Sequence, residues 1–377
     1  MAIADFVRKA EHSINRAGLR RKTEAGWRPA ITGFRGYGSP ERIHVLGRVL
    51  MADPHDPHDP ANRENGDGPS PAIPGNLPDI RRQARHVSEE AQRGWRQFFT
   101  VQVGDLPVTV RAGARTVHTT TNAGGYIDVL VEDHGLEPGW REVTIEAEGA
   151  EPQQAEVLVT APGAKIGLIS DIDDTVLVTW LPRALLAAWN SWVRHTDQRK
   201  PVPGMNEFYR ELLHDHPDAP VFYLSTGAWN TYETLVDFLR KHDLPKGPLL
   251  LTDWGPTPTG LFRSGQEHKK VQLRNLFIEY PDIQWILVGD DGQHDPLIYG
   301  EAVFEHPDRI IGVALRQLSP GEHVLSHGTT TTLTDPTQPA GRGAPTILGA
   351  NGHELLENYR ATPFPRPGAP RSQEPAE

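Results

Sequence analysis

Residues 166–175, near the middle of the chain, read Ile-Gly-Leu-Ile-Ser-Asp-Ile-Asp-Asp-Thr and limit the possible folds more than any other stretch. The apolar run 166–169 predicts a strand that is buried on both faces of a parallel sheet. Asp171 and Asp173 follow at the carboxyl edge, where open α/β sheets bind their ligands. Because buried carboxylates without partners are costly, the pair indicates a site for a cation or for strong hydrogen-bond donors. An acidic turn that only caps the next helix is the alternative.

The sequence after this stretch alternates between short apolar runs and amphipathic segments. We expect further strands at 221–224, 249–251, 285–288 and 310–315, with helices at 229–242, 269–279 and near 295–306. Such alternation predicts an α/β domain with a Rossmann-like, doubly wound parallel sheet over 163–318.

The preceding residues have a β pattern. Residues 43–50 and several short apolar groups between 95 and 160 predict strands about ten residues apart, which is typical of an antiparallel β-sandwich. We therefore expect a β-sandwich domain over 28–162, with an insertion at about 52–80 whose composition predicts disorder. Residues 319–377 are rich in Pro, Gly and Thr, and predict a largely disordered tail with one short helix near 353–359.

Charge and composition narrow the class of protein. The 377 residues exceed what one hydrophobic core usually supports, and the net charge of −11 argues against nucleic acid as a main partner. The chain has no cysteine, which excludes disulfides, thiolate metal sites and cysteine nucleophiles and fits a reducing compartment. A cytoplasmic protein is the resulting expectation.

The first residues differ in charge from the rest. Residues 1–50 carry ten Lys or Arg against four Asp or Glu, a net +6, which leaves −17 for the remainder. Within 1–27, apolar residues at helical spacing predict a basic amphipathic helix that could lie on an anionic membrane surface. A helix packed against its own protein fits the pattern equally well. We expect neither a secretory signal nor a membrane-spanning helix.

Polar groups follow the other strands of the predicted sheet. They are two hydroxyls, a glycine, a lysine and two carboxylates: Ser225, Thr226, Gly227, Lys269, Asp290 and Asp295. Because the carboxyl ends of parallel strands share one edge, we expect these groups to converge on Asp171 and Asp173. Each alone has an ordinary explanation, such as a solvated lysine or a helix cap, but the combination and its order favour a site.

This combination suits phosphoryl transfer. Asp171 can attack phosphorus in line and form an aspartyl-phosphate, while Asp173 can protonate the leaving oxygen and then activate water. Because the nucleophile and the phosphate are both anions, a Mg²⁺ cofactor is needed. Asp171, the backbone carbonyl of Asp173, and Asp290 would give the ion oxygen ligands. Lys269 would neutralise charge on the nucleophile and phosphate, and Ser225 would donate to a phosphoryl oxygen.

The same motifs resemble a known superfamily. The order Asp-x-Asp-x-Thr, strand-end Ser, Lys, and Gly-Asp-x₄-Asp is similar to haloacid dehalogenase-like phosphatases. More narrowly, 171–175, 202–205, 247–251, 253–256, 268–269 and 289–296 resemble the phosphatidate phosphatase family first known from a yeast actin-patch protein. The resemblance covers about 165–318, and the β segment with Gly-Arg-Val-Leu at 47–50 is similar to bacterial members.

The resemblance implies a role for each matching residue. Asp171 matches the nucleophile and Asp173 the acid/base, and Ser225, Lys269 and Asp290 match the other motifs. The expected catalytic residues are thus Asp171, Asp173, Ser225 and Lys269, the substrate-binding residues Thr175, Thr226 and Gly227, and the metal ligands Asp171, Asp173, Asp290 and the supporting acid Asp295. Asp291 and Ala228 depart from the family pattern beside the site, which affects the expected substrate more than the chemistry.

The segment 176–193 bears on the substrate. Trp180, Trp189 and Trp192 are side chains typical of membrane interfaces, and the segment would overhang the site. It is either an apolar cap that admits a lipid phosphate or a helix packed over the sheet edge. The leading hypothesis is a magnesium-dependent phosphatidate phosphatase with peripheral contact to the membrane. The alternatives are a phosphatase of soluble small phosphomonoesters, and a membrane- or partner-binding module with residual catalysis.

Overall fold

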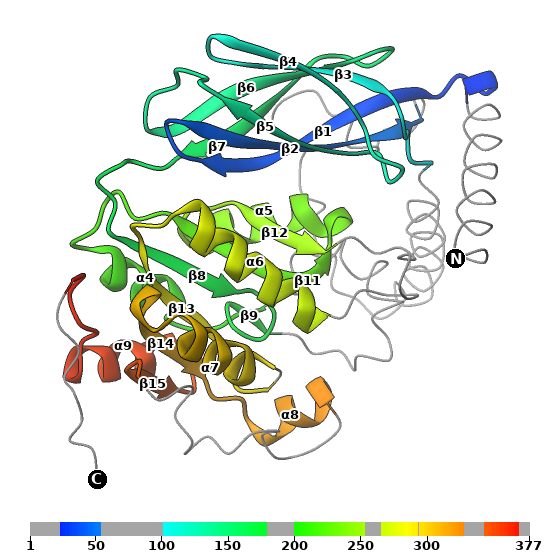
Figure 1. Cartoon of the computed structure of the whole chain (residues 1–377). Helices are drawn as coiled ribbons and strands as arrows, with labels where there is room; N and C mark the ends of the chain where they lie inside the picture. Colours follow the sequence, from blue (N-terminus) through cyan, green and yellow to red (C-terminus); the bar gives the residue numbers. More distant parts are fainter. Residues whose placement is uncertain are drawn as a thin grey trace, which may run out of the picture. The chain divides into compact units, whose positions relative to one another are not determined.

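The computed structural model describes residues 23–53, 101–178, 200–252, 265–292, 294–327 and 343–368. The described residues up to Val159 form one compact unit and those from Thr160 onward form a second (Figure 1). Residues 1–22 of the expected basic helix, residues 54–80 of the expected insertion and most of the tryptophan-rich segment 176–193 lie outside the described residues.

The first unit is a seven-stranded sheet with the order β4-β3-β6-β7-β1-β2-β5. Its strands are β1 Arg28–Gly38, β2 Arg42–Ala52, β3 Pro107–Ala112, β4 Arg115–Thr120, β5 Tyr126–Glu132, β6 Gly139–Ala147 and β7 Gln153–Val159. The expectation of purely antiparallel pairing is wrong, because β1 and β7 pair in parallel. The hairpin β1–β2 leaves one edge of β1 open, and β7 returns from its own hairpin with β6 along that edge.

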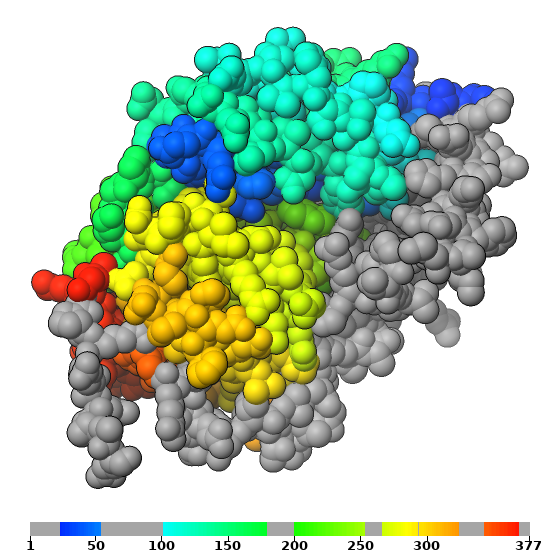
Figure 2. All heavy atoms as spheres, in the orientation of Figure 1, coloured from blue at the N-terminus to red at the C-terminus, as the bar shows by residue number. Residues whose placement is uncertain are grey.

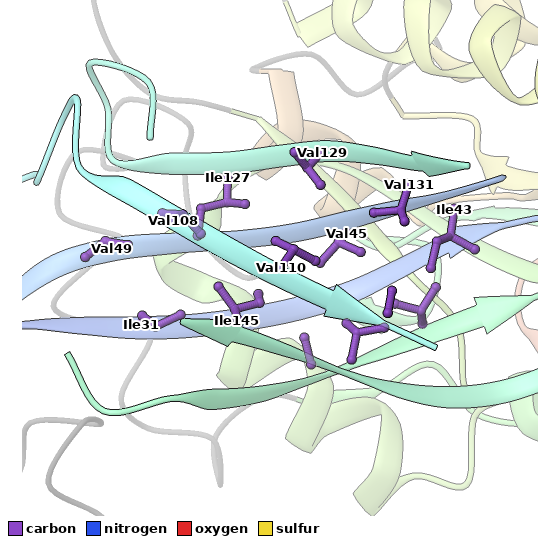
Figure 3. Close-up of a cluster of buried hydrophobic side chains, with 14 of the residues drawn as sticks. Ile31, Ile43, Val45, Val49, Val108, Val110, Ile127, Val129, Val131 and Ile145 are labelled. Carbon is purple, nitrogen blue, oxygen red and sulfur yellow. The ribbon is translucent and has the colours of Figure 1, made fainter. Parts of the chain in front are cut away.

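One hydrophobic core holds this unit together. Strand β5 alternates between buried and exposed residues, as a strand with one solvated face should. Val110 on β3 and Val45 on β2 belong to the same buried cluster although the two strands are not neighbours in the sheet, so the sheet curls around a shared core (Figure 3). Each fully buried Val or Ile contributes roughly 1.5–3 kcal/mol to folding.

The second unit contains a six-stranded sheet, in the order β12-β11-β8-β13-β14-β15, and every neighbouring pair is parallel. Its strands are β8 Ile166–Asp171, β11 Val221–Ala228, β12 Leu249–Thr252, β13 Gln284–Asp290, β14 Ile310–Arg316 and β15 Thr346–Gly349. The chain builds outward from β8 to β12 and then crosses to β13, so strand order reverses between β8 and β13. This reversal is where doubly wound sheets bind ligands, and the predicted α/β class is confirmed.

Helices connect the parallel strands. They are α4 Met205–Leu213, α5 Tyr232–Lys241 after the short η5 Trp229–Thr231, α6 Gly265–Glu279, α7 Asp295–Glu305 followed by η6 Pro307–Arg309, α8 Pro320–His327 and α9 Gly352–Ala361. Two short strands, β9 Leu177–Val178 and β10 Lys200–Pro201, pair separately. Helices α6 and α7 lie at the surface and are joined by the Arg274–Glu305 ion pair at 2.8 Å (Figure 2). None of the helices in the described part of the chain has the length and apolar character that crossing a bilayer requires.

The expectation of a largely disordered tail is wrong for α8 and for residues 343–368, whereas the expected short helix near 353–359 is confirmed as part of α9. Strand β15 adds to the sheet beside β14, and α9 follows with Asn351 as its N-cap, whose side chain accepts from the backbone N–H groups of His353 and Glu354 at 3.0 and 3.1 Å. Phe364 is buried in the same unit. The strand is only Thr-Ile-Leu-Gly within a Pro- and Gly-rich sequence, so it acquires its structure by pairing with β14 rather than from its own pattern. Residues 328–342 and 369–377 lie outside the described residues.

Candidate active site

Asp171 is the last residue of β8, whose six residues are all buried. β8 lies between β11 and β13, so its carboxyl end is at the point where the strand order reverses. The carboxylate is 2% exposed, and the Thr175 hydroxyl donates to its Oδ2 at 3.1 Å. The predicted nucleophile and the predicted substrate-binding Thr175 are therefore in direct contact.

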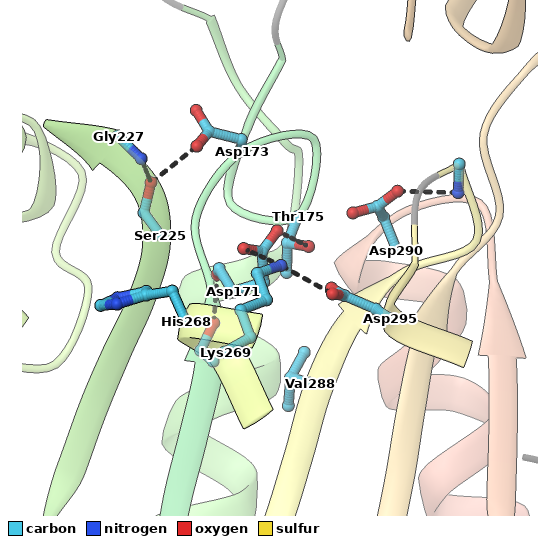
Figure 4. Close-up of polar contacts among 12 residues, drawn as sticks. Asp171, Asp173, Thr175, Ser225, Gly227, His268, Lys269, Val288, Asp290 and Asp295 are labelled. Atoms are coloured by element: carbon cyan, nitrogen blue, oxygen red, sulfur yellow. Dashed lines mark hydrogen bonds and ion pairs between the residues drawn. The ribbon is translucent and has the colours of Figure 1, made fainter. Parts of the chain in front are cut away.

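Lys269 enters the site from the first turns of α6. Its Nζ lies 2.7 Å from Asp171 Oδ1 and 2.6 Å from Asp295 Oδ1, and the side chain is buried (Figure 4). Burial lowers the pKa of Lys269, but the nearby carboxylates of Asp171 and Asp295 outweigh it and hold the pKa above its usual value. The ammonium group is thus a fixed positive charge between two carboxylates.

The carboxylates outnumber this one ammonium. Asp290 ends β13 and Asp295 begins α7, and both are fully buried. Burial raises the pKa of Asp171 to about 8 although Lys269 opposes the shift, and the charges of Asp295 and Asp173 add to it. Burial and the neighbouring Asp295 and Asp171 likewise hold the pKa of Asp290 well above its usual range. The site carries more negative charge than its own residues neutralise.

These carboxylates fit a divalent cation. Asp171, Asp290 and Asp295 each offer a carboxylate oxygen within 4.8 Å of the others. Asp290 Oδ1 accepts from the Gly292 N–H at 2.7 Å, but Asp290 Oδ2 and Asp295 Oδ2 are buried without a hydrogen-bond partner among the described residues. Buried carboxylate oxygens require a cation or a donor, and oxygen ligands are those that Mg²⁺ prefers. Three of the four predicted metal ligands therefore converge.

Asp173 takes a different position from the other predicted ligands. Its Oδ2 accepts a hydrogen bond of 2.8 Å from the Ser225 hydroxyl, and the side chain is outside the three-carboxylate cluster. Its carboxylate is thus held apart from Asp171, as an acid/base separate from the nucleophile would be. Any contact of Asp173 with the metal would therefore be made by its backbone carbonyl, not by its side chain.

The predicted phosphate-binding turn ends β11. The Gly227 N–H donates to Ser225 Oγ at 2.9 Å, so the hydroxyl links this turn to Asp173. The Thr252 hydroxyl, at the end of β12, donates to the backbone carbonyl of Thr226 at 2.7 Å and to that of Gly227 at 3.1 Å. Two neighbouring strands thereby fix the position of the turn.

Further residues support the site: Ser170 and Tyr209, which the sequence did not single out, and Asp291, which the sequence placed beside the site. The Ser170 hydroxyl donates to the Asp171 backbone carbonyl at 2.6 Å and lies 2.6 Å from the Tyr209 hydroxyl on α4. Asp291 Oδ1 accepts from the Leu318 N–H at 2.8 Å, which ties this residue to the turn after β14. A serine inside an otherwise apolar strand was the one available signal for Ser170; nothing in the sequence indicated that Tyr209, 39 residues away, would be its partner.

Comparisons with known proteins agree with the motifs. Residues 166–317 match the family model described as "Phosphatidate phosphatase APP1, catalytic domain". The chain is 29% identical to phosphatidate phosphatase APP1 of Saccharomyces cerevisiae over 152 residues, and 27% identical to an uncharacterized protein of Schizosaccharomyces pombe over 162 residues. These alignments cover 40% and 41% of this chain but only 26% and 25% of the relatives. The chain therefore spans about a quarter of each relative's length.

Solved structures give more distant likenesses. The HAD domain of effector protein Lem4 from Legionella pneumophila is 16% identical, with a TM-score of 0.27, over 41% of this chain and 85% of that one. A structure described as a putative beta-phosphoglucomutase from Thermotoga maritima is 11% identical, with a TM-score of 0.28, over 52% of this chain and 99% of that one. Neither carries an argument at these scores. The family model and the yeast relative together confirm the resemblance: residues 166–317 are similar to the phosphatidate phosphatase APP1 catalytic-domain family.

Proposed function

We propose that the chain is a magnesium-dependent phosphatidate phosphatase that works through an aspartyl-phosphate intermediate. The observation that carries the proposal is the buried cluster at the carboxyl edge of the sheet. In this cluster Lys269 Nζ lies 2.7 Å from Asp171 Oδ1, and the carboxylates of Asp290 and Asp295 complete a set of oxygen ligands. A general structural role would not require so many charges to be buried together.

The chain's own residues divide the reaction into two steps. A carboxylate oxygen of Asp171 attacks phosphorus, and the bond from phosphorus to the ester oxygen breaks as that oxygen takes a proton from Asp173. Asp173 then removes a proton from a water molecule that attacks the aspartyl-phosphate and releases inorganic phosphate. The hydrogen bond from Ser225 to Asp173 Oδ2 supports this role, because it orients the acid/base.

Electrostatics decides whether the first step can occur. Asp171 must be ionised to attack, whereas burial raises its pKa to about 8. Lys269 favours the ionised form and screens the approach of an anionic phosphate. Asp171, Asp290 and Asp295 would hold Mg²⁺, which would supply the remaining positive charge and polarise a phosphoryl oxygen.

The proposal of a lipid substrate rests on similarity to the matched family and the yeast relative rather than on the geometry of the site. The matched family and the yeast relative are named for phosphatidate. The apolar cap expected over 176–193 stays a prediction from the sequence, because most of that segment lies outside the described residues. Peripheral contact with an anionic membrane and a cytoplasmic location complete the proposal.

A phosphatase panel tests the function and the substrate separately. Phosphate release from phosphatidate in mixed micelles should require Mg²⁺, exceed release from soluble phosphomonoesters, and vanish in Asp171→Asn. Equal or faster turnover of the soluble esters would reject the lipid substrate and favour a small-phosphate phosphatase. Activity that survives in Asp171→Asn would reject the nucleophile and, with it, the proposed mechanism.

A further inference from the structure

We propose that Arg316, the last residue of β14, is a positioning residue that holds the loop carrying Asp173 in its working conformation. The proposal concerns a residue outside the expected site, and its catalytic consequence rests on the proposed phosphatase function. Arg316 is 5% exposed, and its side chain contacts neither Asp171 nor Asp173 among its described hydrogen bonds. Its effect is therefore exerted through the backbone.

The Arg316 guanidinium joins three segments of the second unit. Its Nη1 donates to the backbone carbonyl of Asp174 at 2.7 Å, its Nε to that of Ala350 at 3.2 Å, and its Nη2 to Glu322 Oε1 at 2.5 Å. These partners lie in the loop after β8, in the turn between β15 and α9, and on α8. A planar fork with five donors can make these contacts at once, which a lysine cannot.

The loop after β8 needs such an anchor. Asp174 directly follows the acid/base and has a φ of +58°, a left-handed conformation that costs a non-glycine residue about 1 kcal/mol or more. The backbone hydrogen bonds of this loop share one acceptor. The N–H groups of Thr175, Val176 and Leu177 all donate to the Ile172 carbonyl, at 3.0–3.3 Å. Strained backbone persists only where surrounding contacts determine it. The bond from Arg316 to the Asp174 carbonyl is one such contact, from 142 residues away.

Arg316 acts by position rather than by charge. Glu322 neutralises the guanidinium, and Glu322 is itself fixed by the Ser319 N–H, which donates to its Oε2 at 2.8 Å. A neutral, buried ion pair contributes little to the binding of an anionic phosphate. Arg316 instead fixes the position of the loop that carries Asp173. Displacement of a reacting group by about 1 Å can lower a rate on the order of a hundredfold.

The chemistry of the leaving group provides a selective test. An alkoxide leaves only if Asp173 delivers a proton, whereas p-nitrophenolate leaves without one. Hydrolysis of the aspartyl-phosphate is common to both esters, so the contrast lies in the first step, which kcat/KM reports. Loss of the Arg316 contact should therefore lower kcat/KM for an alkyl phosphate more than kcat/KM for p-nitrophenyl phosphate. A change that only reduced the amount of folded protein would slow both equally.

We would compare Arg316→Met with Arg309→Met. Arg309, the last residue of η6 and the residue directly before β14, is a matched control because it donates to the backbone carbonyls of Phe277 and Ile283 at 2.7–3.2 Å. In Arg316→Met, kcat/KM for the better of the two alkyl substrates, phosphatidate and glycerol 3-phosphate, should fall on the order of tenfold or more. For p-nitrophenyl phosphate it should fall by less than about threefold. Arg309→Met should change both rates by one common factor. An equal fall for the two ester classes in Arg316→Met overturns the proposal.

Hydrogen exchange separates this proposal from the proposed function. The backbone amides of Thr175, Val176 and Leu177 should exchange about tenfold faster in Arg316→Met and at the wild-type rate in Arg309→Met. Unchanged protection of these amides overturns the positioning role even if the protein is an active phosphatase. If instead the wild type shows no hydrolysis that depends on Asp171, the proposed function fails, and the exchange result still decides whether Arg316 holds the loop.

Discussion

The two units bury different kinds of residue. The main buried cluster described in the first unit is built from Val, Ile, Ala and Met side chains, and the buried polar residues Thr121 and His134 of this unit have hydrogen-bond partners. The second unit has an apolar sheet interior too, but it buries three carboxylates and an ammonium at one edge. The difference indicates that the first unit is organised for stability and that the second gives up stability at the place where chemistry is proposed.

The largest effect is expected from removing one charge at that edge. Asp171→Asn keeps the size of the side chain but abolishes the nucleophile, so kcat should fall on the order of 10⁴-fold or more. Thermal stability without metal should not fall, because one of several crowded carboxylates loses its charge. Asp128→Asn, on the solvent side of β5 in the first unit, serves as the control and should leave kcat unchanged. A large loss of folded protein in Asp171→Asn would contradict the comparison.

The opposite result is expected in the core of the first unit. Ile145 is fully buried in β6, and Ile145→Ala should lower the free energy of unfolding of this unit by about 2–5 kcal/mol. Phosphate release per folded molecule should stay near the wild-type value. Denaturant unfolding monitored together with activity checks this, with Leu130→Ala as the matched control because Leu130 is exposed on β5. A specific loss of activity without loss of stability would show that the first unit takes part in catalysis.

The pH dependence of stability should also distinguish the units. Because the folded-state pKa of Asp171 is raised to about 8, above the ordinary value near 4, folding favours its protonated form. This contribution is complete below about pH 4 and is lost as pH rises toward 8. Metal-free protein should therefore lose stability in the second unit between pH 5 and 8, and Mg²⁺ should restore it at pH 8. Urea unfolding at both pH values, with and without Mg²⁺, measures this. A restoration by Mg²⁺ that persists when Asp290 is changed to Asn would argue against the assigned ligands.

The smallest effect concerns the C-terminal part of the second unit. Asn351→Ala removes the cap of α9 and should cost about 1 kcal/mol of stability. Because the adjacent Ala350 carbonyl accepts from Arg316, a modest change in activity should follow. Asn351→Ser, which retains a capping oxygen, should recover most of the stability in a thermal melt. If Asn351→Ala melts like the wild type, α9 is not an integral part of the unit.

Sequence patterns gave the parts of the fold that depend on local chemistry. Long apolar runs predicted the central strands, and the residues at their ends predicted Asp171, Asp173, Ser225, Lys269, Asp290 and Asp295 as neighbours, because strand ends of a parallel sheet share one edge. The family resemblance then gave them roles. In the structure the Asp171, Lys269, Asp290 and Asp295 side chains meet in one cluster, and Asp173 meets Ser225.

Features that depend on distant pairing escaped prediction. The four residues of β15 are too short to have a pattern of their own, and the parallel pairing of β1 with β7 joins residues about 120 positions apart. Neither local sequence predicts the contact from Arg316 to Asp174, because an arginine at the end of a strand has the same local pattern whatever its partner is. Such contacts are decided by packing of the whole unit rather than by local preference.

Mass spectrometry of acid-quenched protein tests the central claim most directly. The wild type, mixed with phosphatidate and Mg²⁺ and quenched within one turnover, should carry one added phosphoryl group on the peptide that contains Asp171. With p-nitrophenyl phosphate, whose leaving group needs no proton, the group should accumulate in Asp173→Asn, in which hydrolysis of the intermediate lacks its base, and it should be absent from Asp171→Asn with either substrate. Phosphate release from phosphatidate with no phosphoryl group on that peptide, or with the group on another residue, would contradict the account.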